Sequence, residues 1–285
     1  MKKLFLSSLI MSTLLLVGCN DDKAEQKIQQ LEAQVKQLTQ EQMVKVEDKV
    51  VLFQKQDETY PVEFSITTLK TNKEWLNSLL VEQLLVKQME SKQELKIENP
   101  KAELIKIMEQ KYQNEMNEAK ELFADQPKEK ISGTYFSAVD HTNMDYVGQK
   151  ENIATFTQSY YSYIGGAHGM YHTNYINVDL NKQKMLTLDD LFSQENQAKL
   201  KEMLWQRYEP QYNSADGNMG FFFKSKQKLY LPADFYFSAV GINFVYPVYE
   251  IGAYADGQKE LMLYWQEIEE LIKPEYRFSK PVISE

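Results

Sequence analysis

The sequence is poor in cysteine, glycine and proline, and each shortage excludes a class of protein. Its 285 residues contain one Cys, too few for an intrachain disulfide framework or a cysteine-rich zinc site. With 11 Gly and 8 Pro, collagen-like and low-complexity chains are also excluded. The 32 Lys and Arg are outnumbered by 41 Asp and Glu, and the resulting net charge of −9 argues against a nucleic-acid binder. What remains is an acidic globular body of one large or two small domains.

The amino terminus has the pattern of an export signal. Lys2 and Lys3 precede an apolar run over 4–17, which is shorter than the roughly 20 residues that a membrane-spanning helix needs. The run ends in Leu-Val-Gly-Cys, and this Cys19 is the only cysteine. The segment resembles a bacterial lipobox, in which the cysteine thiol receives a lipid. We therefore predict a signal peptide over 1–18 and a lipid anchor of the palmitate type at Cys19; the alternative is a secretory signal with an incidental cysteine.

A spacer without glycine, proline or aromatic residues follows the cysteine. Its apolar residues recur at alternating spacings of four and three, which is the pattern of a coiled-coil seam. They are Ala24, Ile28, Leu31, Val35 and Leu38. Over 19–48 this pattern predicts a coiled-coil-like stalk that can self-associate, and the alternative is a solvated linker with a helical bias.

The body divides by composition into a helix-rich α+β region over 49–130 and an aromatic-rich α+β region over 131–285. In the first region, short strands are predicted over 50–53 and 62–66. The segment from Thr71 to Glu74 has the pattern of a capping box that opens a helix. Asn99-Pro100 has the pattern of an N-cap followed by the first residue of a second helix.

In the second region the apolar residues recur at every second position over 176–180 and 242–248, as in half-buried strands. Gly165-Gly166 is typical of a tight turn with positive φ. Helices are predicted after Ser193 and over 266–272. Together these patterns predict an α+β fold, an antiparallel sheet with helices packed on one face, preceded by the helical stalk.

Three segments, in this order, resemble a single protein family. The aromatic run 160–163 leads into Gly165-Gly166-Ala167-His168, and the segments 177–192 and 249–257 follow. They are similar to the signature of a domain of unknown function that forms the extracellular part of RsiV-type anti-sigma factors. The same domain occurs beside deacetylase domains in some peptidoglycan deacetylases. The resemblance covers about 150–275.

RsiV-type proteins bind lysozyme through this ectodomain, so the resemblance implies a binding module rather than an enzyme. This sequence departs from the RsiV pattern where signalling is concerned. It shows neither a transmembrane helix nor a cytoplasmic sigma-binding segment. We therefore expect no anti-sigma role.

A tyrosine-rich stretch around the glycine pair supplies the candidate binding residues. They are Tyr160, Tyr161, Tyr163, His168, Tyr171 and Tyr175. Some of these rings must be core, and the others can present rigid amphipathic surfaces to a glycan or a protein. For His168 the favoured interpretation is a hydrogen bond to the backbone around the turn. The alternative is a metal pair with His172, which an extended strand disfavours because four residues span about 13 Å.

The sequence contains no recognisable catalytic constellation. It has no Gly-x-Ser-x-Gly elbow, and its single cysteine is assigned to the lipid. We expect no enzyme activity, no metal and no other cofactor. The expected function is that of a lipid-anchored envelope protein, in the outer membrane if the envelope has two, that binds lysozyme-type wall-active proteins or peptidoglycan. Its negative charge suits a basic partner. The alternative is a cell-wall accessory enzyme, of hydrolase or deacetylase type, that uses His168.

Overall fold

The computed structural model describes residues 26–31, 33, 42–89, 97–127, 131, 137–212 and 226–278. The chain divides into two compact units, 1–44 and 45–285. In the first unit, residues 26–31 are helical. The predicted signal peptide, Cys19 and three of the five seam residues, Ala24, Val35 and Leu38, lie outside the described residues. None of the helices described combines the length and the apolar character that crossing a membrane requires.

A six-stranded sheet dominates the second unit. Its strands are β1 (Val46–Gln56), β2 (Val62–Thr71), β3 (Ala138–Lys150), β4 (Ile153–Ile164), β5 (Met170–Asp179) and β6 (Lys184–Met185), and they lie in this order across the sheet. All neighbours are antiparallel except β2 and β3, which are parallel. The sheet therefore continues across the change in composition at residue 131, and β1 occupies the last residues assigned to the stalk.

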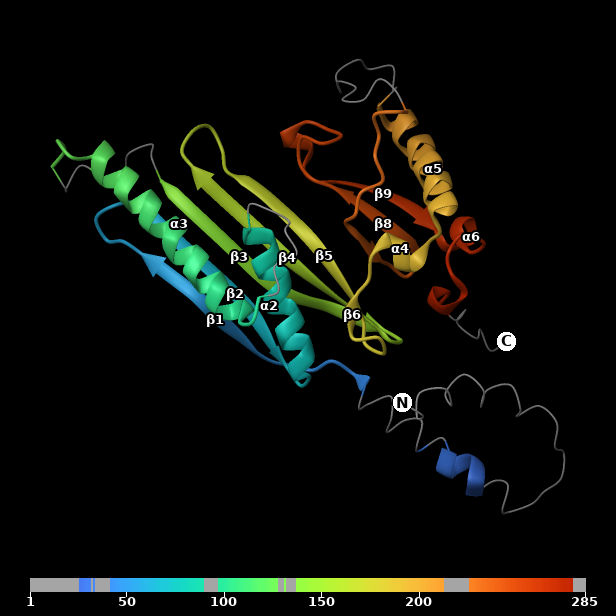
Figure 1. The fold of residues 1–285 in the computed structure, drawn as a ribbon. Helices are drawn as coiled ribbons and strands as arrows, with labels where there is room; N and C mark the ends of the chain where they lie inside the picture. Colours follow the sequence, from blue (N-terminus) through green and yellow to red (C-terminus); the bar gives the residue numbers. More distant parts are fainter. Residues whose placement is uncertain are drawn as a thin grey trace. The chain divides into compact units, whose positions relative to one another are not determined.

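Helices α2 (Glu74–Gln88) and α3 (Pro100–Leu122) cover one face of this sheet (Figure 1). Their apolar stripes are buried against the strands. The buried side chains are Leu76, Leu80, Leu84 and Leu85 of α2 and Leu104, Met108, Tyr112 and Met116 of α3. Phe64 of β2 meets the Tyr112 ring edge to face, with centroids 5.7 Å apart. The α+β fold with helices on one face of a mainly antiparallel sheet is thereby confirmed.

The starts of the two helices differ in how well local sequence predicts them. Asn99 caps α3 by accepting a backbone N–H of the first turn, and Pro100 is the first helical residue, as predicted. The capping box at Thr71 is wrong, because Thr71 is the last residue of β2 and α2 begins only at Glu74. The Thr71 hydroxyl donates instead to Asn77 Oδ1 at 2.8 Å. Pairing in the sheet thus prevails over the local capping signal.

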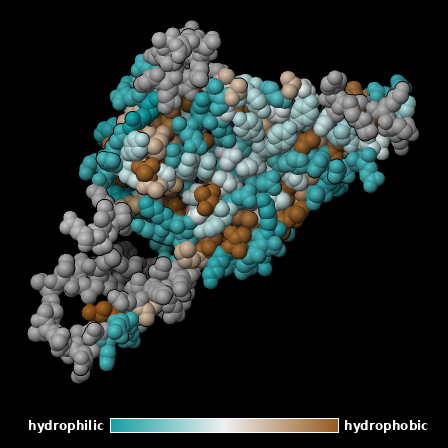
Figure 2. Space-filling view, turned by 180° about the vertical axis from the view of Figure 1, so that it is seen from behind, coloured by the Kyte–Doolittle hydropathy of each residue, from teal (hydrophilic) through white to brown (hydrophobic). Residues whose placement is uncertain are grey.

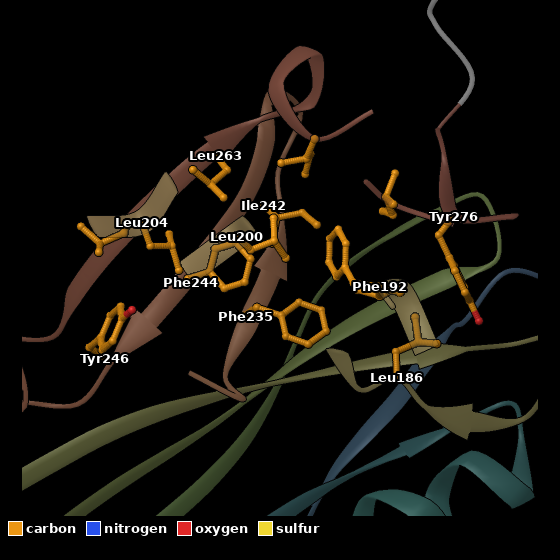
Figure 3. Close-up of a cluster of buried hydrophobic side chains, with 14 of the residues drawn as sticks. Leu186, Phe192, Leu200, Leu204, Phe235, Ile242, Phe244, Tyr246, Leu263 and Tyr276 are labelled. Carbon is orange, nitrogen blue, oxygen red and sulfur yellow. The ribbon is translucent and has the colours of Figure 1, made fainter. Parts of the chain in front are cut away.

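A second, three-stranded antiparallel sheet consists of β7 (Phe235–Phe237), β8 (Gly241–Tyr246) and β9 (Lys259–Tyr264). It packs with α4 (Leu188–Leu191), α5 (Gln194–Tyr212) and α6 (Trp265–Ile268). Figure 3 shows side chains of both kinds of element gathered in one cluster. The cluster includes Leu200 and Leu204 of α5 and Phe235, Ile242 and Phe244 of the sheet.

Two sequence predictions for this region need correction. All six residues of β8 are buried, so the strand is not half-buried, because it is the central strand of the small sheet. The last helix is Trp265–Ile268 rather than 266–272, since the chain then turns and Ile272 forms a β-bridge with Phe192.

The other face of the large sheet is not covered by α2 and α3. Figure 2, seen from behind, shows mostly hydrophilic atoms with separate hydrophobic patches. Side chains of a strand alternate between the two faces. Neighbouring residues of β4 and β5 therefore meet two different environments, the helix-covered face and the face without α2 and α3.

Candidate functional site

The hairpin of β4 and β5 places the predicted tyrosines on two different faces of the large sheet. Its register places Tyr161 opposite Tyr171 and Tyr160 opposite His172. Tyr160 and His172 line a cavity together with lysines of α2 and α3, so they lie on the helix-covered face. Because side chains alternate, Tyr161 and Tyr171 share the other face, where directly opposed rings can interact.

The turn of this hairpin depends on glycine. Gly165 and Gly166 have φ values of +92° and +96°, the left-handed region that was predicted for them. The Tyr163 hydroxyl donates to the Gly166 carbonyl at 2.9 Å, so this predicted site residue fixes the turn. At Gly169, a Cβ would lie 2.6 Å from the Tyr161 ring. Only a glycine lets that ring lie against the chain.

The segment 249–257 lies against the same turn. The His168 ring stacks on Tyr254, with centroids 3.7 Å apart and an angle of 17° between the planes. Tyr171 meets Tyr254 edge on, at 5.7 Å between centroids. The ring centroids of Tyr249 and Tyr254 lie 5.4 Å apart. We call the resulting group the aromatic cluster, and it consists of Tyr161, His168, Tyr171, Tyr249 and Tyr254.

Hydrogen bonds determine the tautomer of His168. Its Nδ1 lies 3.1 Å from the Gly169 carbonyl, and a carbonyl can only accept, so Nδ1 carries the proton. In the neutral ring Nε2 then accepts from the Tyr249 hydroxyl, 3.1 Å away. The Tyr254 hydroxyl donates to the same Gly169 carbonyl, and burial raises the pKa of this phenol. His168 thus bonds the backbone beside the turn, as predicted.

Tyr249 has a strained backbone. Its φ of +69° is in the left-handed region, which costs a residue other than glycine about 1–3 kcal/mol. Its side chain nevertheless stays 45% exposed, and Tyr161 is 42% exposed. Exposed Ile164 and Met170 flank the hairpin turn. The chain therefore holds a costly conformation that presents an aromatic ring to the solvent.

The small sheet positions the segment 249–257 by covering the edge of β5. Asp234 Oδ1 accepts the backbone N–H of Tyr175 at 2.7 Å. Gln258 Oε1 accepts the N–H of Thr173 at 2.9 Å, and Gln258 Nε2 donates to the Thr173 carbonyl at 3.0 Å. Side chains thus form hydrogen bonds with backbone N–H and C=O groups at the edge of β5, which could otherwise pair with another strand. Because Gln258 follows 249–257 directly, these bonds fix the segment beside the hairpin.

The structure separates the six predicted residues. Tyr161, His168 and Tyr171 belong to the aromatic cluster, whereas Tyr163 serves the turn. Tyr175 stacks on Tyr236 of the small sheet, with centroids 4.3 Å apart. Tyr160 faces the helices and hydrogen-bonds with Asp140; burial, more than this bond, raises the pKa of its phenol. Sequence reasoning missed two members, Tyr249 and Tyr254, although the segment that contains them was one of the three resemblance motifs.

The ring nitrogens of both histidines near the hairpin, His168 and His172, are engaged in hydrogen bonds. The ring nitrogens of His168 bond to a carbonyl and a phenol, and neither bonds to a carboxylate. His172 has its own partners, Asn174 Oδ1 at 2.7 Å and Asp234 Oδ2 at 3.5 Å. Within the described ranges, no group of three His, Cys, Asp or Glu residues could hold a metal ion. What the cluster offers a ligand is ring faces, hydroxyl groups and one imidazole.

Comparisons with known proteins agree with this fold. A family model described as a protein of unknown function, DUF3298, matches residues 189–266, which include the segment 249–257 but not the β4–β5 hairpin. A DUF3298 family protein from Bacteroides fragilis is similar in structure, with a TM-score of 0.57 and 21% identity over 81% of this chain and 93% of that chain. For one from Pseudomonas aeruginosa the TM-score is 0.52 and the identity 18%, over 84% and 97% of the two chains.

No curated protein gives a significant match. At identities of 18% and 21% the structural likeness shows a shared fold and does not carry a function across. The chain is thus similar to DUF3298 proteins, in sequence over 189–266 and in fold over most of its length.

Proposed function

We propose that this protein is a binding module of the bacterial cell envelope and that the aromatic cluster contacts its partner. The observation that carries the proposal is the exposed cluster itself. Two segments of the chain form it, and hydrogen bonds of Tyr249 and Tyr254 hold these segments together. The backbone of Tyr249 is strained where it presents the ring to the solvent. Rigid tyrosine rings give a large contact area at little cost in side-chain entropy, and they are common anchors of interfaces.

The proposed partner is a basic wall-active protein of the lysozyme type, with peptidoglycan as the second candidate. Two features support a basic protein. The chain has a net charge of −9, which speeds the encounter with a cation. Tyrosine ring faces also attract lysine and arginine side chains. The sequence resemblance to lysozyme-binding ectodomains points the same way. Sugar rings of peptidoglycan could stack on the same tyrosines, which keeps the glycan as an alternative.

The test is calorimetric titration of the full chain, purified in mild detergent, with a panel of lysozymes of different structural classes and with soluble peptidoglycan fragments. We expect binding to at least one lysozyme. Tyr161→Ala and Tyr254→Ala should each weaken it at least about tenfold, or about 1.4 kcal/mol. Tyr264→Ala is the matched control, since this tyrosine is 40% exposed on β9 and lies outside the cluster. Equal affinity of all three variants would contradict the proposal.

The enzyme alternative makes a different prediction for His168. A hydrolase or deacetylase that uses this imidazole should release fragments or acetate from peptidoglycan, and His168→Ala should abolish the release. As a binding module, the full chain should show no turnover with or without the substitution. Measured release that depends on His168 would replace the binding module by the enzyme.

We further propose that Cys19 carries a lipid that tethers the module to the membrane. Several acyl chains anchor a protein stably, because each buried methylene contributes about 0.8 kcal/mol. Cys19→Ala should release the protein from the membrane fraction and abolish labelling by a radioactive fatty acid. Undiminished membrane association of this variant would contradict the anchor.

A further inference from the structure

A serine and a histidine share a hydrogen bond on the face of the large sheet that α2 and α3 do not cover. Ser65 Oγ lies 2.8 Å from His141 Nδ1. Phe64 of β2 packs on Tyr112 of α3, so Ser65, the next residue of the strand, points to the opposite face. The register of β2 and β3 places His141 directly beside Ser65. Because 76 residues separate the two, no local sequence motif reveals the pair.

A carboxylate favours one tautomer of His141. Its Nε2 lies 3.7 Å from Glu63 Oε1, and a carboxylate can only accept, so the neutral ring carries its proton on Nε2. The lone pair is then on Nδ1, which accepts from the Ser65 hydroxyl. The side chains of His141 and Glu63 are 28% and 41% exposed, so a small molecule can reach the pair. A hydroxyl bonded to a base that a third group orients is the arrangement of an activated nucleophile.

An amide donor lies beside the pair. Asn143 follows His141 by two residues of β3, so both side chains share a face, and its neighbour on β2 is Thr67. The Thr67 hydroxyl donates to Asn143 Oδ1 at 2.9 Å, which orients the amide. Its Nδ2 donates no hydrogen bond to any residue that the structure describes. An oriented N–H donor next to a nucleophile can stabilise the negative charge that develops on a carbonyl oxygen.

We propose that Ser65 is the nucleophile of a site that hydrolyses small carboxylic esters. Ser65 Oγ bonds to the carbonyl carbon while its proton moves to His141 Nδ1, and Asn143 Nδ2 donates to the oxyanion. The bond from the carbonyl carbon to the leaving oxygen then breaks, and the alcohol leaves with the proton from Nδ1. Water attacks the acyl-serine with His141 again as the base. The carboxylic acid leaves, and Ser65 regains its proton. Glu63 is a positioning residue that acts through His141.

The chemistry of the site favours an ester over a peptide bond. An alcohol leaves more easily than an amine, and one amide donor on a solvent-accessible face stabilises an oxyanion less than several donors in a closed site. The site borders the aromatic cluster, because Tyr161 lies opposite His141 on β4. Its reacting groups are not members of that cluster. The proposal therefore depends neither on the proposed binding partner nor on His168.

The first test is labelling of the full chain with a fluorophosphonate probe, in which Ser65 Oγ bonds to phosphorus and displaces fluoride. We expect mass spectrometry of the digested protein to find the label on Ser65, and heat-denatured protein to remain unlabelled. Absence of the label, its presence on other residues alone, or equal labelling of the denatured chain would overturn the proposal. This measurement needs no variant, so it decides even where a substitution prevents folding.

The second test is hydrolysis of p-nitrophenyl acetate by the full chain. Ser65→Ala and His141→Ala should each lower kcat/KM at least about 100-fold, and Asn143→Ala at least about tenfold. Ser159→Ala is the matched control and should change nothing, because this half-buried serine of β4 has Thr173 rather than a histidine as its partner. Equal rates of the Ser65 and Ser159 variants would contradict the assignment.

Glu63→Gln separates positioning from a purely structural role. The substitution keeps the size of the side chain and removes the charge that holds the proton on Nε2. We expect kcat to fall at least about tenfold with KM unchanged, because binding of the ester does not use this group. An unchanged kcat, or a change in KM alone, would show that Glu63 does not act through His141.

Discussion

The two faces of the β4–β5 hairpin are built from the same strands and present different chemistry. On the helix-covered face, Gln158, Tyr160 and His172 line a polar cavity. On the other face, Tyr161 and Tyr171 join an exposed aromatic cluster. The difference follows from the alternation of side chains along a strand, which sends adjacent tyrosines to opposite sides. A tyrosine-rich sequence therefore does not define a single surface until the register of the strands is known.

The largest contrast between the faces should appear in stability. Phe156 is fully buried on the helix-covered face, so Phe156→Ala should lower the free energy of unfolding by about 3–5 kcal/mol. Tyr161→Ala, on the exposed face of the same strand, should cost about 1 kcal/mol or less. Urea denaturation of the two variants checks the comparison. Similar losses would mean that the Tyr161 face is part of the core.

A smaller loss of stability is expected at Gly169, whose backbone lies against the Tyr161 ring. Gly169→Ala should cost about 1 kcal/mol, because the new Cβ would lie 2.6 Å from the Tyr161 ring and this half-exposed ring must move away. In a Tyr161→Ala background the obstacle is gone, and the cost of the same substitution should fall by at least about 0.5 kcal/mol. Thermal or chemical unfolding of the four proteins in this cycle measures the coupling. Additive costs would show that Tyr161 does not lie on Gly169.

Loss of the hydroxyl of Tyr249 should be milder. Tyr249→Phe removes the hydrogen bond to His168 Nε2, and we expect a loss of about 0.5–1.5 kcal/mol, at the low end because solvent can reach both groups. The ring stays, so partner binding should weaken less than in Tyr254→Ala. A larger loss of affinity in Tyr249→Phe would mean that the hydroxyl itself contacts the partner.

The smallest expected effect is a pH dependence on the helix-covered face. Burial raises the pKa of Asp140, with Lys111, His141 and Tyr160 opposing. The folded state therefore holds the proton to a higher pH than the unfolded chain, whose Asp titrates near about 3.9. This group favours the fold below the unfolded pKa, and its contribution is lost as pH rises through the folded pKa.

Asp140→Asn removes this contribution. The stability of the wild type relative to this variant should fall as pH rises through that window, as measured by denaturation between about pH 4 and pH 8. A relative stability that rises with pH would show that the carboxylate is stabilised by Lys111 more than it is destabilised by burial.

Local signals predicted some elements well. Asn99 and Pro100 mark the start of α3, and Gly165-Gly166 marks the hairpin turn, because each depends on residues within one turn of chain. The strands were predicted too short. β1 extends over Val46–Gln56, but three consecutive exposed charged residues, Glu47, Asp48 and Lys49, lie near its start, and Val46 and Val51 are exposed as well, so no regular apolar alternation marks this edge strand. The parallel pairing of β2 with β3 is long-range, and no local pattern encodes it.

The candidate site was predicted only in part, because some of its residues are close in sequence and others are distant. Tyr161, His168 and Tyr171 lie close in sequence, so composition was enough to single them out. Tyr254 bonds to Gly169 across 85 residues of sequence, and Tyr249 bonds to His168 across 81, so only the fold brings these two tyrosines to the site. Tyr160 could have been separated from Tyr161 by strand alternation alone. Counting aromatic residues without assigning faces included it in the predicted site.

The measurement that tests the aromatic cluster most directly is hydrogen exchange of the full chain, followed by mass spectrometry, with and without a lysozyme that the titration shows to bind. The account predicts slower exchange in two segments, 161–171 and 249–257, and unchanged exchange in α3. Protection confined to other segments, or none in either of these two, would contradict the claim that the cluster is the binding surface.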